Sequence, residues 1–176
     1  MKKMSENKKQ DLAKENKVDK IFNELDAIYT NHNLSLMALL VFISYFGIMG
    51  IIWMIPFPQF DFLVKMNAHT FLNWGSFFIA IIIYLYLKLA PTLSYAVLLC
   101  ISIISFFIVQ LEYVEKDGGP AVIIVSIVLA LIGLLGLFFY IRKSGSKLDT
   151  KSFSKLIGYG PIWLWSKLFK KFNIKY

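Results

Sequence analysis

Four long apolar runs without a single charged residue constrain this chain more than any other feature of its sequence. They cover residues 36–55, 71–87, 92–111 and 121–141. Each is close to the ~20 residues that a helix needs to cross ~30 Å of hydrocarbon. A helix pairs its backbone N–H and C=O groups within its own segment, whereas an open strand would leave them unpaired in lipid. The runs therefore predict four membrane-spanning helices.

Short polar segments separate the runs and predict how they connect. Pro56 and Pro58 follow the first run, and Lys88 with Pro91 makes a tight turn after the second. Residues 117–120, Asp-Gly-Gly-Pro, favour another turn before the fourth run. We therefore expect an all-α fold, an integral membrane four-helix bundle made of two helical hairpins. A content of 57% hydrophobic residues agrees, since a soluble domain is far less apolar.

Lysine and arginine residues lie outside the runs and predict the orientation of the chain. Seven lysines precede the first run, and Arg142 with eight lysines follows the fourth. Lys88 belongs to the same side, whereas the two loops on the other side carry only Lys65 and Lys116. Basic segments next to a span stay in the cytoplasm. Both termini are therefore expected on the cytoplasmic side. The membrane is expected to be a bacterial inner membrane, although a protein of the endoplasmic reticulum would follow the same rule.

The N-terminal segment divides into a polar part and an amphipathic part. Residues 1–17 mix lysines with acidic residues and hold few apolar ones, so we expect a mobile charged segment. From Val18 onward, apolar residues recur at helical spacing, at positions 18, 21, 22, 25, 28 and 29. This pattern predicts a short amphipathic helix on the cytoplasmic surface. Residues 18–176 are expected to form a single membrane domain.

The C-terminal segment predicts a second interfacial helix, over residues 162–173. Pro161 suits the first turn of a helix, and the apolar side chains from Ile162 to Phe172 share a face opposite a lysine-rich one. Tryptophans and lysines hold such a helix among lipid headgroups. Next to four membrane spans, this basic cluster indicates membrane lipid as its partner and no nucleic acid. The expected membrane-interface anchors are Trp163, Trp165, Lys167, Lys170 and Lys171.

The absence of charge from the four runs excludes one attractive function for a chain of this length. A four-helix multidrug exporter needs a carboxylate inside the membrane, but Glu112 lies only at the outer edge of the third run. The pairs Gly47 with Gly50 and Gly133 with Gly136 instead predict close contacts between helices. Such packing would also suit a structural subunit of a larger membrane complex.

The two histidines and the single cysteine limit the metal chemistry of the chain. His32 lies just before the first run and His69 just before the second, so the thickness of a membrane separates their levels. We therefore do not expect them to bind one metal ion together. Cys100 stands alone inside the third run, which excludes an intrachain disulfide and a thiolate metal cluster.

Several short segments, in order along the chain, resemble one known family. They are FNELDAIYTNHN at 22–33, YLYLKLAPTL at 84–93, Gln110 followed by Glu115 and Pro120-Ala121, and GPIWLW at 160–165. Together they resemble the Mpo-like group of 2-hydroxy fatty acid dioxygenases, small multi-pass membrane proteins, over about residues 22–176.

The resemblance implies an iron-dependent oxygenase that shortens 2-hydroxy fatty acids by one carbon, with histidines as metal ligands. His32 matches the first histidine of the family pattern and is the residue for which the resemblance implies a catalytic and metal-binding role. The second histidine of the pattern falls near Leu40 or Val41, and a further one near Val114. Since non-haem iron usually takes two histidines and a carboxylate, the chain lacks most of the expected ligands.

Three functional hypotheses follow. The first is a non-catalytic relative of this family that binds lipid or a partner protein at its cytoplasmic face, with no cofactor expected. The second is an iron-dependent dioxygenase centred on His32, with Glu24, Asp26 or Asp149 as carboxylate ligand. The third is a structural subunit of a membrane complex, with a membrane protein or a second copy of the chain as partner.

Overall fold

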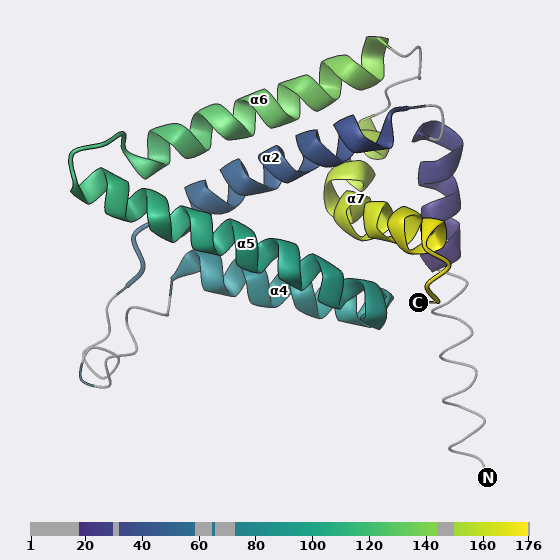
Figure 1. Cartoon of the computed structure of the whole chain (residues 1–176), viewed down its shortest axis with the longest axis horizontal. Helices are drawn as coiled ribbons and strands as arrows, with labels where there is room; N and C mark the ends of the chain where they lie inside the picture. Colours follow the sequence, from purple (N-terminus) through teal and green to yellow (C-terminus); the bar gives the residue numbers. More distant parts are fainter. Residues whose placement is uncertain (1–17, 30–31, 59–64, 66–72, 144–149, 176) are drawn as a thin grey trace.

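The structure is a computed structural model that describes residues 18–29, 32–58, 65, 73–143 and 150–175. Over this part of the chain the fold is all-α and contains no strand. A first helix covers residues 18–29. The others are α2 (Leu34–Trp53), α4 (Trp74–Leu89), α5 (Pro91–Lys116), α6 (Val122–Lys143) and α7 (Thr150–Lys171), shown in Figure 1.

Three of these helices are long and apolar enough to cross a membrane. They are α2 with 20 residues, α5 with 26 and α6 with 22. By their length and composition these helices indicate an integral membrane protein of the multi-pass kind, as the apolar runs predicted. The fourth predicted span, 71–87, appears as α4, an apolar helix of 16 residues that begins at Trp74. Residues 71 and 72 and the predicted mobile segment 1–17 lie outside the described residues.

Side-chain caps explain where two of the helices begin. The side-chain oxygen of Asn33 accepts hydrogen bonds from the backbone N–H groups of Ser35 and Leu36 at the start of α2. Asn73 does the same for Ser76 N–H at the start of α4, at 2.8 Å. Both asparagines satisfy N–H groups that have no partner within the first turn of a helix.

The end of α5 differs from the predicted span, which stopped at residue 111. The helix continues to Lys116, and the carboxylate of Glu115 accepts a hydrogen bond from Val122 N–H at the start of α6, at 2.9 Å. Loss of apolar character marks the edge of the hydrocarbon, but a helix continues through it where its residues favour the conformation. Gly118, with φ of 90°, then reverses the chain.

The helices pair differently from the two sequential hairpins that the sequence predicted. The closest pair is α2 with α6, far apart in the chain, and α4 lies along α5 (Figure 1). A Cβ on Gly47 would overlap the backbone nitrogen of Ala130, and one on Gly133 would lie 2.5 Å from the backbone nitrogen of Ser44. The close helix contact expected at these glycines is thus present, and it selects α6 as the neighbour of α2.

Helix α7 corrects the prediction of an interfacial helix over 162–173. It spans Thr150–Lys171, and Pro161 lies inside it instead of opening it. The residues before the proline remain helical because they pack against the bundle, with Leu156 and Gly160 buried. The amphipathic helix expected from Val18 is present over residues 18–29.

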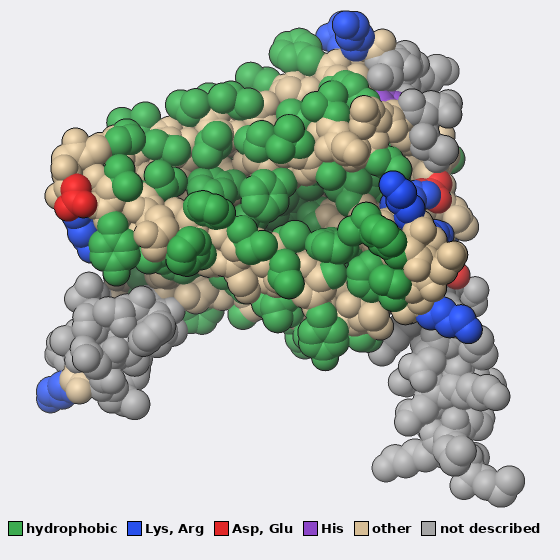
Figure 2. All heavy atoms as spheres, in the orientation of Figure 1, with side chains coloured by type: hydrophobic (Ala, Val, Ile, Leu, Met, Phe, Trp, Pro, Cys, Tyr) green, Lys and Arg blue, Asp and Glu red, His purple; other side chains and the backbone are tan. Residues whose placement is uncertain are grey.

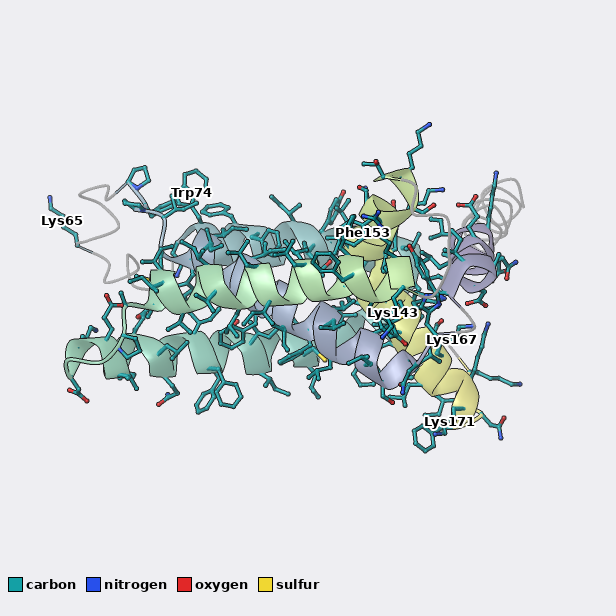
Figure 3. All side chains as sticks on the ribbon, turned by 90° about the horizontal axis from the view of Figure 1, so that it is seen from above. Lys65, Trp74, Lys143, Phe153, Lys167 and Lys171 are labelled. Atoms are coloured by element: carbon teal, nitrogen blue, oxygen red, sulfur yellow. The ribbon has the colours of Figure 1, made fainter. Side chains whose placement is uncertain are left out.

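The pairs α2–α6 and α4–α5 approach each other at one end and diverge toward the other (Figure 1). At the divergent end, α7 lies between α2 and α5 and contacts both. The helix over 18–29 packs on the far side of α7. Figure 3 places Lys143, Lys167 and Lys171 at this end and Lys65 at the opposite one.

Candidate functional site

A cavity of about 580 Å³ lies between α2, α5 and α7, at the end where α2 and α5 diverge. Hydrophobic side chains form most of its wall, and Figure 2 shows the hollowed face among them. Its volume is within the ~300–1,000 Å³ typical of small-molecule sites. The wall residues include Leu39, Phe42, Val97, Ile101, Ile104 and Leu164.

Two lysines of α7 lie at one end of this apolar wall. Lys167 and Lys171 line the cavity and come four residues apart, so they share one face of the helix (Figure 3). Lys167 is partly buried and Lys171 is exposed. The predicted anchor Lys170 is exposed on another face and does not line the cavity. The site therefore combines a long apolar surface with positive charge at one end.

An aspartate from the first helix reaches the inner lysine. Asp26 Oδ1 lies 2.5 Å from Lys167 Nζ and accepts a hydrogen bond of 2.6 Å from Trp163 Nε1. Lys167 Nζ also lies 5.8 Å from the centroid of the Trp163 ring. Asp26 thus connects the helix over 18–29 to the cavity through one residue of α7.

A second ion pair holds the same helix to α7, away from the cavity. Lys155 Nζ lies 2.5 Å from Glu24 Oε2, and the hydrogen bond and the charge of this lysine lower the pKa of the Glu24 carboxyl. Burial raises the pKa of Tyr29 to about 12, because the phenolate would lose its hydration. The helix is therefore held by paired charges at its edge and by buried side chains beneath.

Two tyrosine hydroxyls bind the middle of α7 from α2 and α4. Pro161 has no N–H, so the carbonyl of Ile157, four residues earlier, lacks its donor within the helix. Tyr45 donates a hydrogen bond to that carbonyl at 2.6 Å, and Tyr86 donates to Gly158 O at 2.6 Å. The two hydroxyl oxygens lie 3.2 Å apart. We call this arrangement of Tyr45, Tyr86 and the α7 carbonyls the tyrosine clasp.

His32 lies outside the cavity, between two tyrosine rings. It is only 7% exposed, and its ring makes edge-on contacts with Tyr29 and Tyr140, at centroid distances of 5.7 and 5.5 Å. Within the described part of the chain, neither ring nitrogen of His32 has a hydrogen-bond partner. These contacts are those of a packed histidine at the junction of the first helix, α2 and α6.

The surroundings of His32 do not fit an iron site. Among the residues that the structure describes, no three of the types His, Cys, Asp and Glu lie close enough to hold a metal ion. Glu24 pairs with Lys155, and Asp26 pairs with Lys167 and Trp163. His69 and Asp149 lie outside the described residues.

The two predicted tryptophan anchors have different environments. Trp163 is fully buried, so its ring contacts protein and not lipid headgroups, which corrects its predicted placement. Trp165 is partly exposed, lines the cavity and packs edge-on against Phe169. Trp163 is turned inward because it lies on the face of α7 that covers the first helix.

Sequence reasoning missed Asp26, Tyr45 and Tyr86 as contacts of α7. One signal was available for Tyr45, since a proline within a helix leaves an acceptor four residues earlier that needs an outside donor. Nothing in the spacing of Asp26 indicates that it meets Lys167, because that contact depends on how two helices pack.

No family model, no curated protein and no solved structure matches this chain. The resemblance to the Mpo-like group therefore stays a prediction.

Proposed function

We propose that this protein is a four-span membrane protein that binds one amphiphile with an acidic headgroup. The chain of the amphiphile would occupy the cavity between α2, α5 and α7, and its headgroup would meet Lys167 and Lys171. The observation that carries this proposal is an apolar cavity whose lining includes two lysines of α7, Lys167 and Lys171, both at one end of the molecule (Figure 3). An iron-dependent reaction at His32 has no comparable support.

The size and lining of the cavity suit a single acyl chain. Its volume of about 580 Å³ equals roughly twenty groups the size of a water molecule, at ~30 Å³ each. The two acyl chains of a diacyl lipid would need more room. Inside a membrane the chain leaves other hydrocarbon and not water, so the apolar wall exchanges one set of apolar contacts for another. An amphiphile would gain from this wall what it loses on leaving its neighbours in the bilayer.

The position of the lysines suits an acidic headgroup. They lie at the end of the molecule that also carries Lys143, where the basic residues of the chain gather (Figure 3). The charge rule places that end in the cytoplasm, at the level of the headgroups. A lysine near such a surface attracts an anionic lipid by about 1 kcal/mol. A headgroup there would meet positive charge while its chain points toward the membrane centre.

Helix α4 is proposed as the fourth span. It lies along α5 and begins near Lys65, at the end opposite Lys143 (Figures 1 and 3). Its 16 residues would span about 24 Å at 1.5 Å each, a shortfall against ~30 Å of hydrocarbon that local thinning of the bilayer accommodates. Both chain ends would then be cytoplasmic.

Cysteine accessibility tests this topology. In a Cys100→Ser background, we expect Lys65→Cys to react with a membrane-impermeant maleimide added to intact cells, because that loop faces outward. Lys88→Cys should react only after the membrane is opened. Equal labelling of the two positions in intact cells would place both loops on one side and refute the crossing by α4.

Filling the cavity tests the binding site. Ala38 of α2 lines the cavity, and Ala38→Phe should lower the affinity for palmitoyl lysophosphatidylglycerol at least tenfold, because the ring occupies the space of the chain. Equilibrium binding of the radiolabelled probe to protein in a non-ionic detergent measures this. Ala80→Phe, on an exposed position of α4, is the matched control and should leave the affinity unchanged.

The headgroup contact is tested in the same assay. Lys171→Gln should lower the affinity for lysophosphatidylglycerol but not for the zwitterionic lysophosphatidylcholine. Lys170→Gln, one residue away and outside the cavity, should lower neither affinity. If Ala38→Phe binds the probe as the wild type does, the cavity is not the lipid site.

A further inference from the structure

We propose that the helix over 18–29 regulates this cavity, because Asp26 competes with the acidic headgroup of the ligand for Lys167. The inference rests on the proposed function, since it concerns the same lysines. In this arrangement, Asp26 holds Lys167 and so sets how much positive charge a ligand meets.

The geometry shows that one carboxylate oxygen makes both contacts. Asp26 Oδ1 accepts from Trp163 Nε1 at 2.6 Å and lies 2.5 Å from Lys167 Nζ. The two charged side chains are only 25% and 23% exposed, so water screens the pair incompletely. Trp163 is fully buried and therefore keeps the carboxylate in place. Lys167 is thus already neutralised while it lines the cavity.

The rest of the helix positions Asp26 without touching the cavity. Four apolar side chains, one turn apart, are buried beneath it: Val18, Phe22, Leu25 and Tyr29. Tyr29 contacts Trp163 edge-on at 6.2 Å, and Glu24 pairs with Lys155. This face makes the helix a unit that docks on α7 as a whole. Asp26 is the residue of that unit whose charge reaches a cavity-lining side chain.

Two consequences follow from this competition. While the helix is docked, Lys171 supplies the positive charge at the cavity and Asp26 opposes the approach of a second anion to Lys167. When the helix leaves, Lys167 becomes available and acidic ligands bind more tightly. Linkage requires the reverse as well, so an acidic ligand should loosen the docked helix, while a ligand of no net charge should not.

Asp26→Asn is the direct test. Asparagine keeps an oxygen that accepts from Trp163 Nε1 but removes the charge that holds Lys167. We expect the affinity for palmitoyl lysophosphatidylglycerol to rise about fivefold, with lysophosphatidylcholine unchanged. Asp19→Asn is the matched control, because it removes an exposed carboxylate of the same helix at a position that does not line the cavity. It should change neither affinity.

Hydrogen exchange supplies a readout that does not depend on a variant. Adding lysophosphatidylglycerol to the wild-type protein should speed amide exchange over residues 18–29, and adding lysophosphatidylcholine should not. Equal affinity gains for both probes in Asp26→Asn, or no gain for either, would overturn the competition. If Ala38→Phe abolishes binding but Asp26→Asn behaves as wild type, the site stands and this regulation fails. If Ala38→Phe has no effect, the proposed site itself fails.

Discussion

Gly133→Ala is expected to separate α2 from α6 and to lower the free energy of unfolding by about 2 kcal/mol or more. A methyl group at this position would lie 2.5 Å from the backbone nitrogen and 2.8 Å from the Cα atom of Ser44. Backbone atoms cannot turn aside as a side chain can, so the helices must move apart. Unfolding of the protein in mixed micelles, followed by far-UV circular dichroism, measures the loss.

Gly136→Ala is the matched control for this prediction. It lies one turn further along the same helix, where a methyl group would approach Leu40 Cδ2 at 2.9 Å. That atom is the end of a flexible side chain, which has room to change its rotamer. Both substitutions gain the same helix propensity, so the difference between them isolates the packing. Similar stabilities of the two variants would show that the α2–α6 contact is looser than described.

Tyr45→Phe is expected to cost about 1–2 kcal/mol of folding free energy, because it leaves the Ile157 carbonyl without a donor. The loss should depend on Pro161. Pro161→Ala restores a backbone N–H to α7, so the Ile157 carbonyl regains a partner within its own helix. In that background, Tyr45→Phe should cost clearly less. A double-mutant cycle of the two substitutions, measured by unfolding in micelles, gives the coupling.

Tyr95→Phe is the control for the tyrosine clasp. Its side chain is 67% exposed on α5, so loss of that hydroxyl should have little effect on stability. If Tyr45→Phe costs the same with and without Pro161, the hydroxyl does not act through the carbonyl that the proline leaves free.

The coarse architecture could be predicted from the sequence, because the physics involved is local. The apolar runs predict the helices, since a segment in lipid must satisfy its own backbone. The runs at 36–55, 92–111 and 121–141 correspond to α2, α5 and α6, with ends that differ by a few residues. The helical spacing of apolar residues was also enough to locate the helix over 18–29. Glycine spacing indicated close packing at Gly47 and Gly133 but not which helices meet there.

The candidate site could be predicted only in part. Lys167, Lys171 and Trp165 were singled out as residues of a basic amphipathic helix, and the structure places all three at the cavity. The role assigned to them was contact with the membrane surface, since the sequence of a single helix does not reveal a cavity formed between helices. The cavity exists because α2 and α5 diverge where α7 lies between them, and no short segment encodes that angle.

The sequence by itself determined that this chain is helical, that it belongs in a membrane and at which end its positive charge gathers. Those properties depend on composition and on spacing within single segments. Only the tertiary structure decided that α6 pairs with α2, that Tyr45 donates to the Ile157 carbonyl of α7, and that Asp26 reaches Lys167. Each of these joins residues far apart in the chain, and such contacts depend on how whole helices fit together.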